Sequence, residues 1–185
     1  WENKKEISQK VKSIQIEDLL DRKPIVLDGK SISKQLKDKT VLITGAAGSI
    51  GSEILRQVLL FKPKKIVAID QAETPLHNLC LELNALDSEV DIATIVADIR
   101  NKDAMNNIFS NFKPEVVYHA AAYKHVPLME ENPSQAILTN VEGTKNIADL
   151  ASLFKVKNFV MVSTDKAVNP SNVMGASKRI AEKYV

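Results

Sequence analysis

Five short runs of apolar and β-branched residues alternate with longer helix-like segments from Thr40 onward, and this alternation limits the fold more than any other feature. The runs cover 40–45, 65–70, 91–98, 115–121 and 158–164. The helix-like segments cover 50–61, 72–86, 101–111, 133–154 and 174 onward. Near-continuous apolar strands are typical of a parallel sheet that is buried on both faces. Repeated strand–helix–strand units therefore predict an α/β fold with a doubly wound parallel sheet.

A glycine-rich turn follows the first predicted strand directly. Gly45, Gly48 and Gly51 have two residues between neighbours, and a helix-like segment opens at Ser49 and Ile50. Glycine permits unusual backbone dihedrals and lets the backbone approach a pyrophosphate, while a helix N-terminus offers free N–H groups. The turn therefore predicts dinucleotide binding by a Rossmann domain. The alternative is a tight turn without a ligand.

Carboxylates follow the second and third predicted strands, at the edge of the sheet where ligands bind. Asp70 is placed to accept hydrogen bonds from both hydroxyls of a ribose and to repel a 2′-phosphate, which favours NAD over NADP. Its alternative role is a helix N-cap, because "DQAET" opens a helix. Asp98, which Ile99 follows, is assigned to the adenine amino group.

Small residues follow the fourth predicted strand. Ala120, Ala121 and Ala122 would let a nicotinamide ribose lie close to the backbone, although small residues at a buried strand end also serve packing. Asn140, on the long helix, is polar within an apolar face. We group it with the cofactor residues and expect it to anchor the strand ends, because a buried amide needs hydrogen-bond partners.

Composition excludes several classes of protein. Hydrophobic residues make up 44% and charged residues 26%, which is an ordinary globular balance. A net charge of +2 gives no argument for nucleic-acid binding. No apolar run approaches the roughly 20 residues that cross a bilayer. The single cysteine, Cys80, cannot form an internal disulfide and favours a reduced, cytoplasmic setting. No Cys/His cluster has metal-ligand spacing, so we predict no metal.

Residues 1–39 differ in character from the rest of the chain. They are polar and lysine-rich, and Pro24 and Gly29 interrupt them. We therefore expect a turn-rich arm or linker ahead of one dinucleotide-binding domain, 40–185. The chain starts without Met and stops within the helical pattern "RIAEKYV", which indicates a fragment of a longer protein.

Four motifs together give this chain a family resemblance. "TGAAGSIGSE", "AAAYKHVPLMEENP", "NVEGT" and "VSTDKAVNPSNVMGASKR" resemble the extended short-chain dehydrogenase/reductase superfamily. The sharper resemblance, from about Ile14 to the end, is to the CapD-like nucleotide-sugar 4,6-dehydratases of bacterial capsule and polysaccharide biosynthesis, which act on UDP-N-acetylglucosamine. It implies a lyase with an internal redox cycle, in which NAD removes hydride from C4 of the sugar and returns it to C6 after water is lost.

The resemblance assigns roles to two residues of the last helix. Met174 stands where most of the superfamily has a catalytic tyrosine, and a thioether cannot accept the sugar hydroxyl proton. Methionine is common in the membrane-anchored branch of these dehydratases, so it marks that branch and leaves the base at O4 open. Lys178, one turn on, is assigned to the nicotinamide ribose, and its charge would ease proton loss from O4.

The "STDK" segment after the fifth predicted strand supplies the other catalytic candidates. The resemblance makes Asp165 the acid that protonates the leaving C6 hydroxyl, and Lys166 the base that removes the C5 proton. Thr164 would bind the 4-hydroxyl of the substrate. These roles need a protonated Asp165 and a neutral Lys166, as burial would favour. The alternative for any one of these charges is a solvated surface residue.

Further candidate residues follow the fourth predicted strand. Lys124 is a candidate substrate contact, and the neighbouring His125 is either a second contact or a polar loop residue. We expect capping at the helix start near "ENP" and structural roles for the remaining histidines; the residues concerned are Glu130, Glu131, His77 and His119.

Two other functions remain open from sequence. A nucleotide-sugar 4-epimerase would share the glycine turn but usually needs tyrosine at Met174. A non-catalytic NAD-binding regulatory module would explain the missing tyrosine but not the retained Asp165, Lys166 and Lys178. The sugar-binding segment of the family follows the last helix, so we expect this chain to bind NAD and to turn over little or no substrate. The resemblance also implies transmembrane segments in the parent protein, at the cytoplasmic face of the inner membrane, and leaves a homo-oligomer open.

Overall fold

The structure is a computed structural model that describes residues 28–86 and 88–185. Most of the expected arm, including Pro24, lies outside the described residues. Ser33–Val185 form one compact unit. The predicted boundary between residues 39 and 40 stays a prediction.

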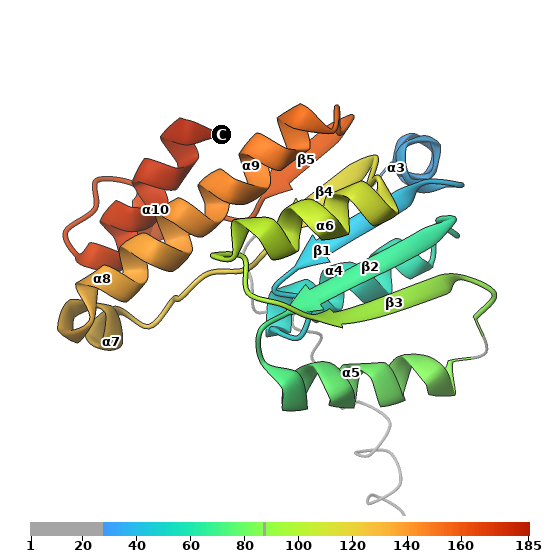
Figure 1. Ribbon diagram of the computed structural model, residues 1–185, viewed down its shortest axis with the longest axis horizontal. Coiled ribbons are helices and arrows are strands. Elements are labelled where there is room, and N and C mark those ends of the chain that lie inside the picture. Colours follow the sequence, from blue (N-terminus) through green and yellow to red (C-terminus); the bar gives the residue numbers. More distant parts are fainter. Residues whose placement is uncertain (1–27, 87) are drawn as a thin grey trace, which may run out of the picture. The chain divides into compact units, whose positions relative to one another are not determined.

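Five parallel strands form one sheet in the order β3-β2-β1-β4-β5 (Figure 1). Their bounds are β1 Thr40–Thr44, β2 Lys65–Asp70, β3 Asp91–Val96, β4 Val116–His119 and β5 Asn158–Met161. The predicted doubly wound parallel sheet is confirmed. Four of the strands end before their predicted last residue, because the chain leaves the ladder there and turns into the loops of the site.

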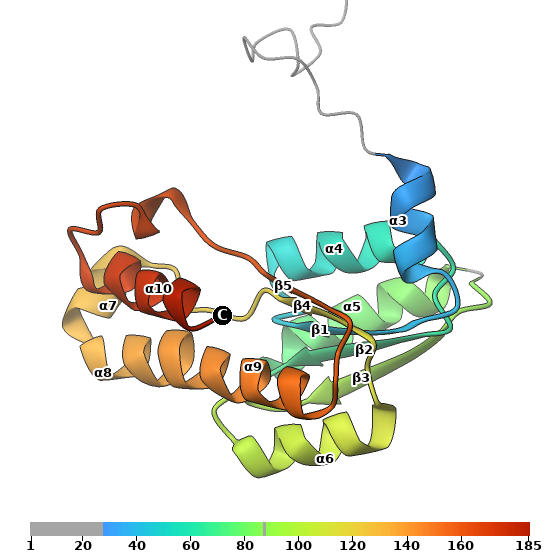
Figure 2. The same ribbon diagram turned by 90° about the horizontal axis from the view of Figure 1, so that it is seen from above.

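Helices cover both faces of the sheet. The helices that cover the sheet are α4 Ser49–Leu59, α5 Glu73–Ala85, α6 Lys102–Phe112 and α9 Thr144–Leu153. Figure 2 shows α4 on one face, with α6 and α9 on the other. The order changes direction between β1 and β4, so their carboxyl ends border the crevice where doubly wound sheets bind ligands.

Apolar side chains from the sheet, α6 and α9 form the main core. Leu42, Val67 and Val117 on the strands pack with Phe109 and Ile147 on the two helices, and all five are almost completely buried. Each such side chain contributes about 1.5–3 kcal/mol by leaving water. The expectation that every strand is buried on both faces is wrong for β3 and β5, which lie at the edges of the described sheet and are half-exposed.

The long helix predicted at 133–154 is interrupted in its middle. It consists of α8 Pro133–Ala136, the π-helix η1 Ile137–Gly143, and α9. π-Helical turns are rare and occur frequently at functional sites. The pattern of apolar residues did not indicate this turn, because a π-turn shifts the helical register without introducing a polar residue or a proline.

The sequence pattern did not predict three further elements, and it predicted a fourth, the last helix, only from residue 174 onward. They are α3 Gly29–Leu36, α7 Val126–Glu131, the short 3₁₀ helix η2 Asp165–Ala167, and α10 Val173–Tyr184. The turn expected at Gly29 is wrong, since a helix begins there and the Asp28 carboxylate accepts hydrogen bonds from the N–H groups of Lys30 and Ser31. α10 confirms the predicted last helix.

Candidate nucleotide-binding site

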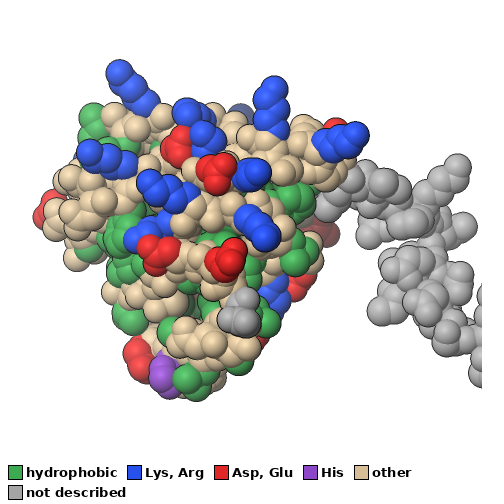
Figure 3. All heavy atoms as spheres, turned by 90° about the vertical axis from the view of Figure 1, so that its right-hand side faces the viewer, with side chains coloured by type: hydrophobic (Ala, Val, Ile, Leu, Met, Phe, Trp, Pro, Cys, Tyr) green, Lys and Arg blue, Asp and Glu red, His purple; other side chains and the backbone are tan. Residues whose placement is uncertain are grey.

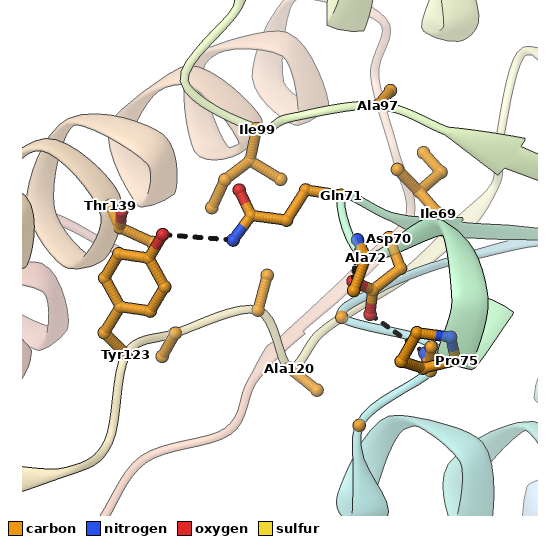
Figure 4. Close-up of a pocket in the computed structure, with 15 residues that line it drawn as sticks. Ile69, Asp70, Gln71, Ala72, Pro75, Ala97, Ile99, Ala120, Tyr123 and Thr139 are labelled. Atoms are coloured by element: carbon orange, nitrogen blue, oxygen red, sulfur yellow. Dashed lines mark hydrogen bonds between the residues drawn. The ribbon is translucent and has the colours of Figure 1, made fainter.

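A cavity of about 270 Å³ lies at the carboxyl ends of β1, β2 and β4 (Figure 4). It is lined by the glycine turn, the loops after β2, β3 and β4, the first turn of α5, and η1: Gly45, Ala47, Gly48, Ile69, Asp70, Gln71, Ala72, Pro75, Ala97, Ile99, Ala120, Ala121, Ala122, Tyr123 and Thr139. Seven of these were predicted: Gly45, Gly48, Asp70, Ile99, Ala120, Ala121 and Ala122. The structure therefore brings together residues from four separate predicted motifs.

The glycine turn can hold only glycine at two positions. Gly45 has φ +66°, and a Cβ there would lie 2.6 Å from the backbone nitrogen of Ala121. A Cβ on Gly51 would overlap the carbonyl oxygen of Gly45. Gly48 is the N-cap of α4 and provides no side-chain cap, so the first N–H groups of the helix face the turn without a protein acceptor from that residue. Ser49 and Ile50 begin the helix but do not line the cavity.

Asp70 joins the glycine turn to the loop after β2. Its carboxylate accepts one hydrogen bond from the N–H of Ala47 at 3.0 Å and another from the N–H of Ala72 at 2.9 Å. Each oxygen keeps a second lone pair, so the carboxylate can still accept from a ligand hydroxyl. The N-cap alternative is wrong, because α5 begins at Glu73 and its N-cap is Ala72.

Thr139 is the main residue of the cavity that sequence reasoning missed. It lies on η1, is only 4% exposed, and its Oγ1 has no hydrogen-bond partner among the described residues. A buried hydroxyl without a partner costs about 1–3 kcal/mol. The Thr139 side chain lines the cavity while Oγ1 itself is shielded from solvent, so a ligand atom would satisfy this hydroxyl only after the side chain turns toward the cavity.

Asn140, the next residue, does not line the cavity, and its contact with the cofactor stays a prediction. Its Oδ1 accepts from the N–H of Tyr123 at 2.8 Å, and its Nδ2 donates to the Tyr123 carbonyl at 3.0 Å and to the Ser177 hydroxyl at 2.9 Å. The expected anchoring of a strand end is therefore confirmed. Asn140 holds the segment after β4 in place and links it to α10.

A buried histidine lies beneath the site. Thr144 donates its hydroxyl proton to the Asn140 carbonyl, so it accepts from Nε2–H of His119 at 2.9 Å. Nδ1 of His119 then accepts from the Thr44 hydroxyl at 2.6 Å. Burial, with the Lys178 charge as a second cause, lowers the pKa of His119 to about 3. The imidazole is neutral, in agreement with the structural role predicted for it.

Tyr123 and Gln71 reach across the cavity from opposite sides (Figure 4). The side-chain amide of Gln71, after β2, donates to the Tyr123 hydroxyl, after β4, at 3.2 Å. Neither residue was predicted, because nothing in a local pattern indicates that two loops separated by 52 residues meet.

Asp98 does not line the cavity, so its assignment to the adenine is not supported by its position. Its carboxylate accepts from Nε of Arg100 at 2.7 Å and from the Arg100 backbone N–H at 2.9 Å. Partial burial acts to raise the pKa of Asp98, but these hydrogen bonds outweigh it and hold the pKa below its ordinary value. Ile99, beside it, does line the cavity and also contacts the core.

The "STDK" segment forms an exposed turn after β5. The Asp165 side chain is 86% exposed and the Lys166 side chain 51% exposed, and their charged atoms lie 3.3 Å apart. The hydrogen bond from the Thr164 hydroxyl, and then Lys166, lower the pKa of Asp165. The condition that burial keeps Asp165 protonated is therefore not met in the described residues, where the side chain is an ionised carboxylate.

Lys178 and Met174 are both buried, in different surroundings. Lys178 is 4% exposed, and its Nζ donates to the Val162 carbonyl at 2.8 Å. Burial lowers the pKa of its amine, while Glu182 acts in the opposite direction. Met174 packs with Met129 and belongs to a small apolar cluster, so its side chain serves packing rather than the cavity. Neither residue lines the cavity.

Two capping contacts fix the start of α10. Oδ1 of Asn172 accepts from the N–H of Gly175 at 2.7 Å, and Oε1 of Glu130 accepts from the N–H of Val173 at 2.6 Å. The capping role predicted for Glu130 therefore exists, but at a helix 43 residues away instead of at the neighbouring "ENP". A Cβ on Gly175 would overlap the Lys166 carbonyl, so glycine lets α10 lie directly against the "STDK" turn.

Lys124 and His125 are exposed and lie next to the cavity lining without being part of it. His125 is the N-cap of α7, and its side chain makes no capping hydrogen bond. Among the described residues, no group of three His, Cys, Asp or Glu side chains is arranged to hold a metal ion. No helix in the described part of the chain has the length and hydropathy of a membrane span.

The cavity has the features that a dinucleotide requires. The glycine turn leaves no room for a side chain against the segment after β4, a helix N-terminus faces the turn, and the Asp70 carboxylate and the unpartnered Thr139 hydroxyl offer polar contacts. The family model described as "Polysaccharide biosynthesis protein" matches residues 41–185. This chain belongs to that family.

Curated members of the polysaccharide biosynthesis family are similar to most of the chain. It is 51% identical over 176 residues to the capsular polysaccharide biosynthesis protein CapD of Staphylococcus aureus, covering 95% of this chain and 29% of CapD. It is 47% identical over 154 residues to the uncharacterized membrane protein MJ1061 of Methanocaldococcus jannaschii, covering 83% of this chain and 44% of that protein. The chain thus spans less than half the length of these relatives.

Other relatives of the family have different activities at similar identity. A UDP-N-acetylglucosamine 4,6-dehydratase (inverting) of Campylobacter jejuni is 35% identical over 146 residues, covering 78% of this chain and 42% of the enzyme. A UDP-glucose 4-epimerase of Rickettsia bellii is 37% identical over 150 residues, covering 79% and 42%. Overall identity therefore does not separate a dehydratase from an epimerase.

Solved structures of the superfamily share the fold. Pen from Bacillus thuringiensis superposes with a TM-score of 0.75 at 40% identity, over 80% of this chain and 46% of that one. WbmG of Bordetella bronchiseptica, in complex with NAD and UDP, superposes with a TM-score of 0.65 at 26% identity, over 78% and 48%. The chain spans about half of each of these structures.

Proposed function

We propose that this chain is the NAD-binding part of a nucleotide-sugar 4,6-dehydratase that acts on UDP-N-acetylglucosamine. The observation that carries NAD binding is the cavity in which the glycine turn lies directly against the segment after β4, with the Thr139 side chain, whose hydroxyl is unpartnered, in its lining. The NAD complex of WbmG, a protein with the same fold, supports the choice of cofactor.

Different residues of the cavity would contact different parts of NAD. Gly45 and Gly48 approach the pyrophosphate, Asp70 accepts from the ribose hydroxyls beside the adenine, and Ala121 leaves room for the nicotinamide side. The Asp70 carboxylate would repel a 2′-phosphate, so NAD binds more tightly than NADP. NAD, when bound, supplies a reversible hydride acceptor.

The described residues at the carboxyl end of β5 would handle protons. Lys166 would remove a proton from C5 of the sugar, and Asp165 would give one to the leaving hydroxyl at C6. These roles need a neutral amine and a protonated carboxyl, which burial of this exposed pair by the substrate and the sugar-binding segment would favour. Thr164 donates to or accepts from the 4-hydroxyl. Lys178, held at the Val162 carbonyl, places a positive charge near the reacting oxygens.

Met174 favours a dehydratase over a 4-epimerase. An epimerase of this superfamily usually needs the hydroxyl of a tyrosine at this position, whereas Met174 is 3% exposed and packed among apolar side chains. The capsular relative CapD supports a place in polysaccharide biosynthesis. MJ1061, a relative called a membrane protein, supports anchoring of the longer parent protein at a membrane. Self-association of the chain stays a prediction.

The decisive experiment is mass spectrometry of UDP-N-acetylglucosamine incubated with NAD and the full-length parent protein in heavy water. Loss of one water with gain of one deuteron at C5 is expected. Asp165→Asn and Lys166→Ala should each abolish this product while the affinity for NAD, measured by calorimetry, stays within about twofold. An inverted C4 configuration without loss of water would identify an epimerase instead.

NAD binding is tested separately on the 185-residue chain, with Gly45→Ala as the control. The added methyl group would collide with the Ala121 backbone, so the variant should lose NAD affinity. Wild-type chain that bound NADP as tightly as NAD would contradict the role proposed for Asp70.

A further inference from the structure

The loops that lead into β1, β2, β4 and β5 carry lysines and no arginine. Because the strands are parallel, these loops share one edge of the sheet, opposite the nucleotide cavity. We call the surface that they form the lysine face: Lys37, Lys39, Lys62, Lys64, Lys65, Lys113, Lys155 and Lys157. The same loops contribute only two carboxylates, Asp38 and Glu115. Figure 3 shows Lys and Arg side chains on this side of the molecule, with Asp and Glu side chains between them.

Ion pairs neutralise only part of this charge. Glu115 lies 3.1 Å from Lys39 and 2.8 Å from Lys157, and Asp91 lies 2.8 Å from Lys65. For the other lysines of the face, no carboxylate within residues 28–86 and 88–185 comes as near as 4.0 Å: Lys37, Lys62, Lys64, Lys113 and Lys155. Four described carboxylates lie at this edge, Asp38, Glu89, Asp91 and Glu115, against eight lysines, so the edge keeps an excess of positive charge.

Backbone hydrogen bonds hold neighbouring loops of the lysine face together. The N–H of Lys64 donates to the Lys39 carbonyl at 2.9 Å, and the N–H of Glu115 donates to the Thr40 carbonyl at 2.9 Å. The N–H of Lys157 donates to the Glu115 carbonyl at 2.8 Å. The lysines therefore project from a connected surface instead of from independent loops.

Three lysines of the face have a backbone that suits another residue type better. Lys62, Lys113 and Lys155 have φ of 49°, 46° and 55°, the left-handed region that favours Gly or Asn at helix ends. Each follows a half-buried phenylalanine at the end of α4, α6 or α9: Phe61, Phe112 and Phe154. A cation is favourable at a helix C-terminus, which accounts for these three but not for Lys64 on the strand side of its loop.

We infer that the lysine face docks the chain on an anionic lipid bilayer. Lysine acts as a point charge and is attracted to a charged surface without the bidentate phosphate geometry of arginine. The phenylalanines of these loops are half-buried, so they offer no open stacking platform for nucleic-acid bases. Docking at this edge leaves the nucleotide cavity facing away from the bilayer. The inference rests on the proposed membrane location and is independent of the proposed reaction.

The test is co-sedimentation of the purified 185-residue chain with phosphatidylcholine vesicles that contain or lack phosphatidylglycerol. The variant Lys62→Asn, Lys113→Asn, Lys155→Asn removes three charges while giving the left-handed positions a residue that fits them, so it should fold at least as well as the wild type. The control Lys102→Gln, Lys145→Gln, Lys183→Gln removes three charges elsewhere. Residues 1–27 are the same in both variants.

The wild type should bind only the anionic vesicles, and the Asn variant should bind them about 100-fold more weakly, or about fivefold per lysine. The control variant should keep most of the affinity, and binding should weaken as salt is raised. Equal binding by the two variants, or no binding to anionic vesicles at low salt, would overturn the inference. Tighter binding to a nucleic-acid duplex than to the vesicles would assign the face to a different polyanion. Unchanged NAD affinity in both variants keeps this result separate from the proposed function.

Discussion

Because the Thr139 hydroxyl is unpartnered, we predict that its removal raises the stability of the free chain and lowers the affinity for NAD. Thr139→Val removes the hydroxyl and keeps the β-branched shape at a site that is 4% exposed. Without a ligand, the free energy of unfolding should rise by about 1 kcal/mol, because a buried polar group without a partner costs about 1–3 kcal/mol. For a chain of this size, the melting temperature should rise by about 2–4 °C.

Saturating NAD should cancel this difference in stability between the valine variant and the wild type. The hydroxyl is then hydrogen-bonded to the ligand, a contact of about 1 kcal/mol, so the valine variant should bind NAD about fivefold more weakly. Calorimetric unfolding with and without NAD measures both effects, and titration calorimetry gives the affinity. Thr139→Ser is the matched control, since it keeps the hydroxyl and should keep the affinity for NAD. A valine variant that is less stable without ligand and unchanged in NAD affinity would refute the reasoning.

Three further predictions concern stability. The pKa of His119 is about 3 in the folded chain and 6.5 when unfolded, so its neutral form contributes fully to the free energy of unfolding above pH 6.5. This contribution is lost as pH falls, by up to about 1.4 kcal/mol per pH unit. Denaturant titrations between pH 6.5 and 5 should show this slope, and His119→Gln should flatten it. Glu130→Ala removes the acceptor for the Val173 N–H and should cost about 1 kcal/mol, whereas Glu130→Gln should cost less; equal losses would show that the cap contributes nothing. Met174→Ala should cost about 2–5 kcal/mol and Met174→Leu less than about 1.5 kcal/mol, with NAD affinity unchanged in the leucine variant, as chemical denaturation and calorimetry can establish.

Local patterns predicted the parts of the site that depend on backbone shape. Gly45, Gly48 and the alanines after β4 were found because a turn between a buried strand and a helix requires small residues in a short stretch of chain. Their convergence on one cavity followed from the parallel order of the strands, which the strand–helix alternation already predicted.

Contacts between distant segments were beyond the reach of those patterns. Gln71 meets Tyr123, and Glu130 caps α10, across 52 and 43 residues respectively. The assignment of Asp98 to a ligand stays a prediction, and the pattern did not show that its carboxylate also accepts from the nearby Arg100 side chain. A motif shows which residue types are available, but not which of their polar atoms another side chain has already taken.

The sequence by itself determined the doubly wound sheet, the glycine turn and the family, since each depends on residue types at short, fixed spacings. Only the tertiary structure decided that Thr139 is unpartnered in the cavity, that Asp165 is an exposed carboxylate, and that Met174 is packed among apolar side chains. The physical reason is that burial and hydrogen-bond satisfaction depend on every element that surrounds a side chain, and those elements come from all parts of the chain.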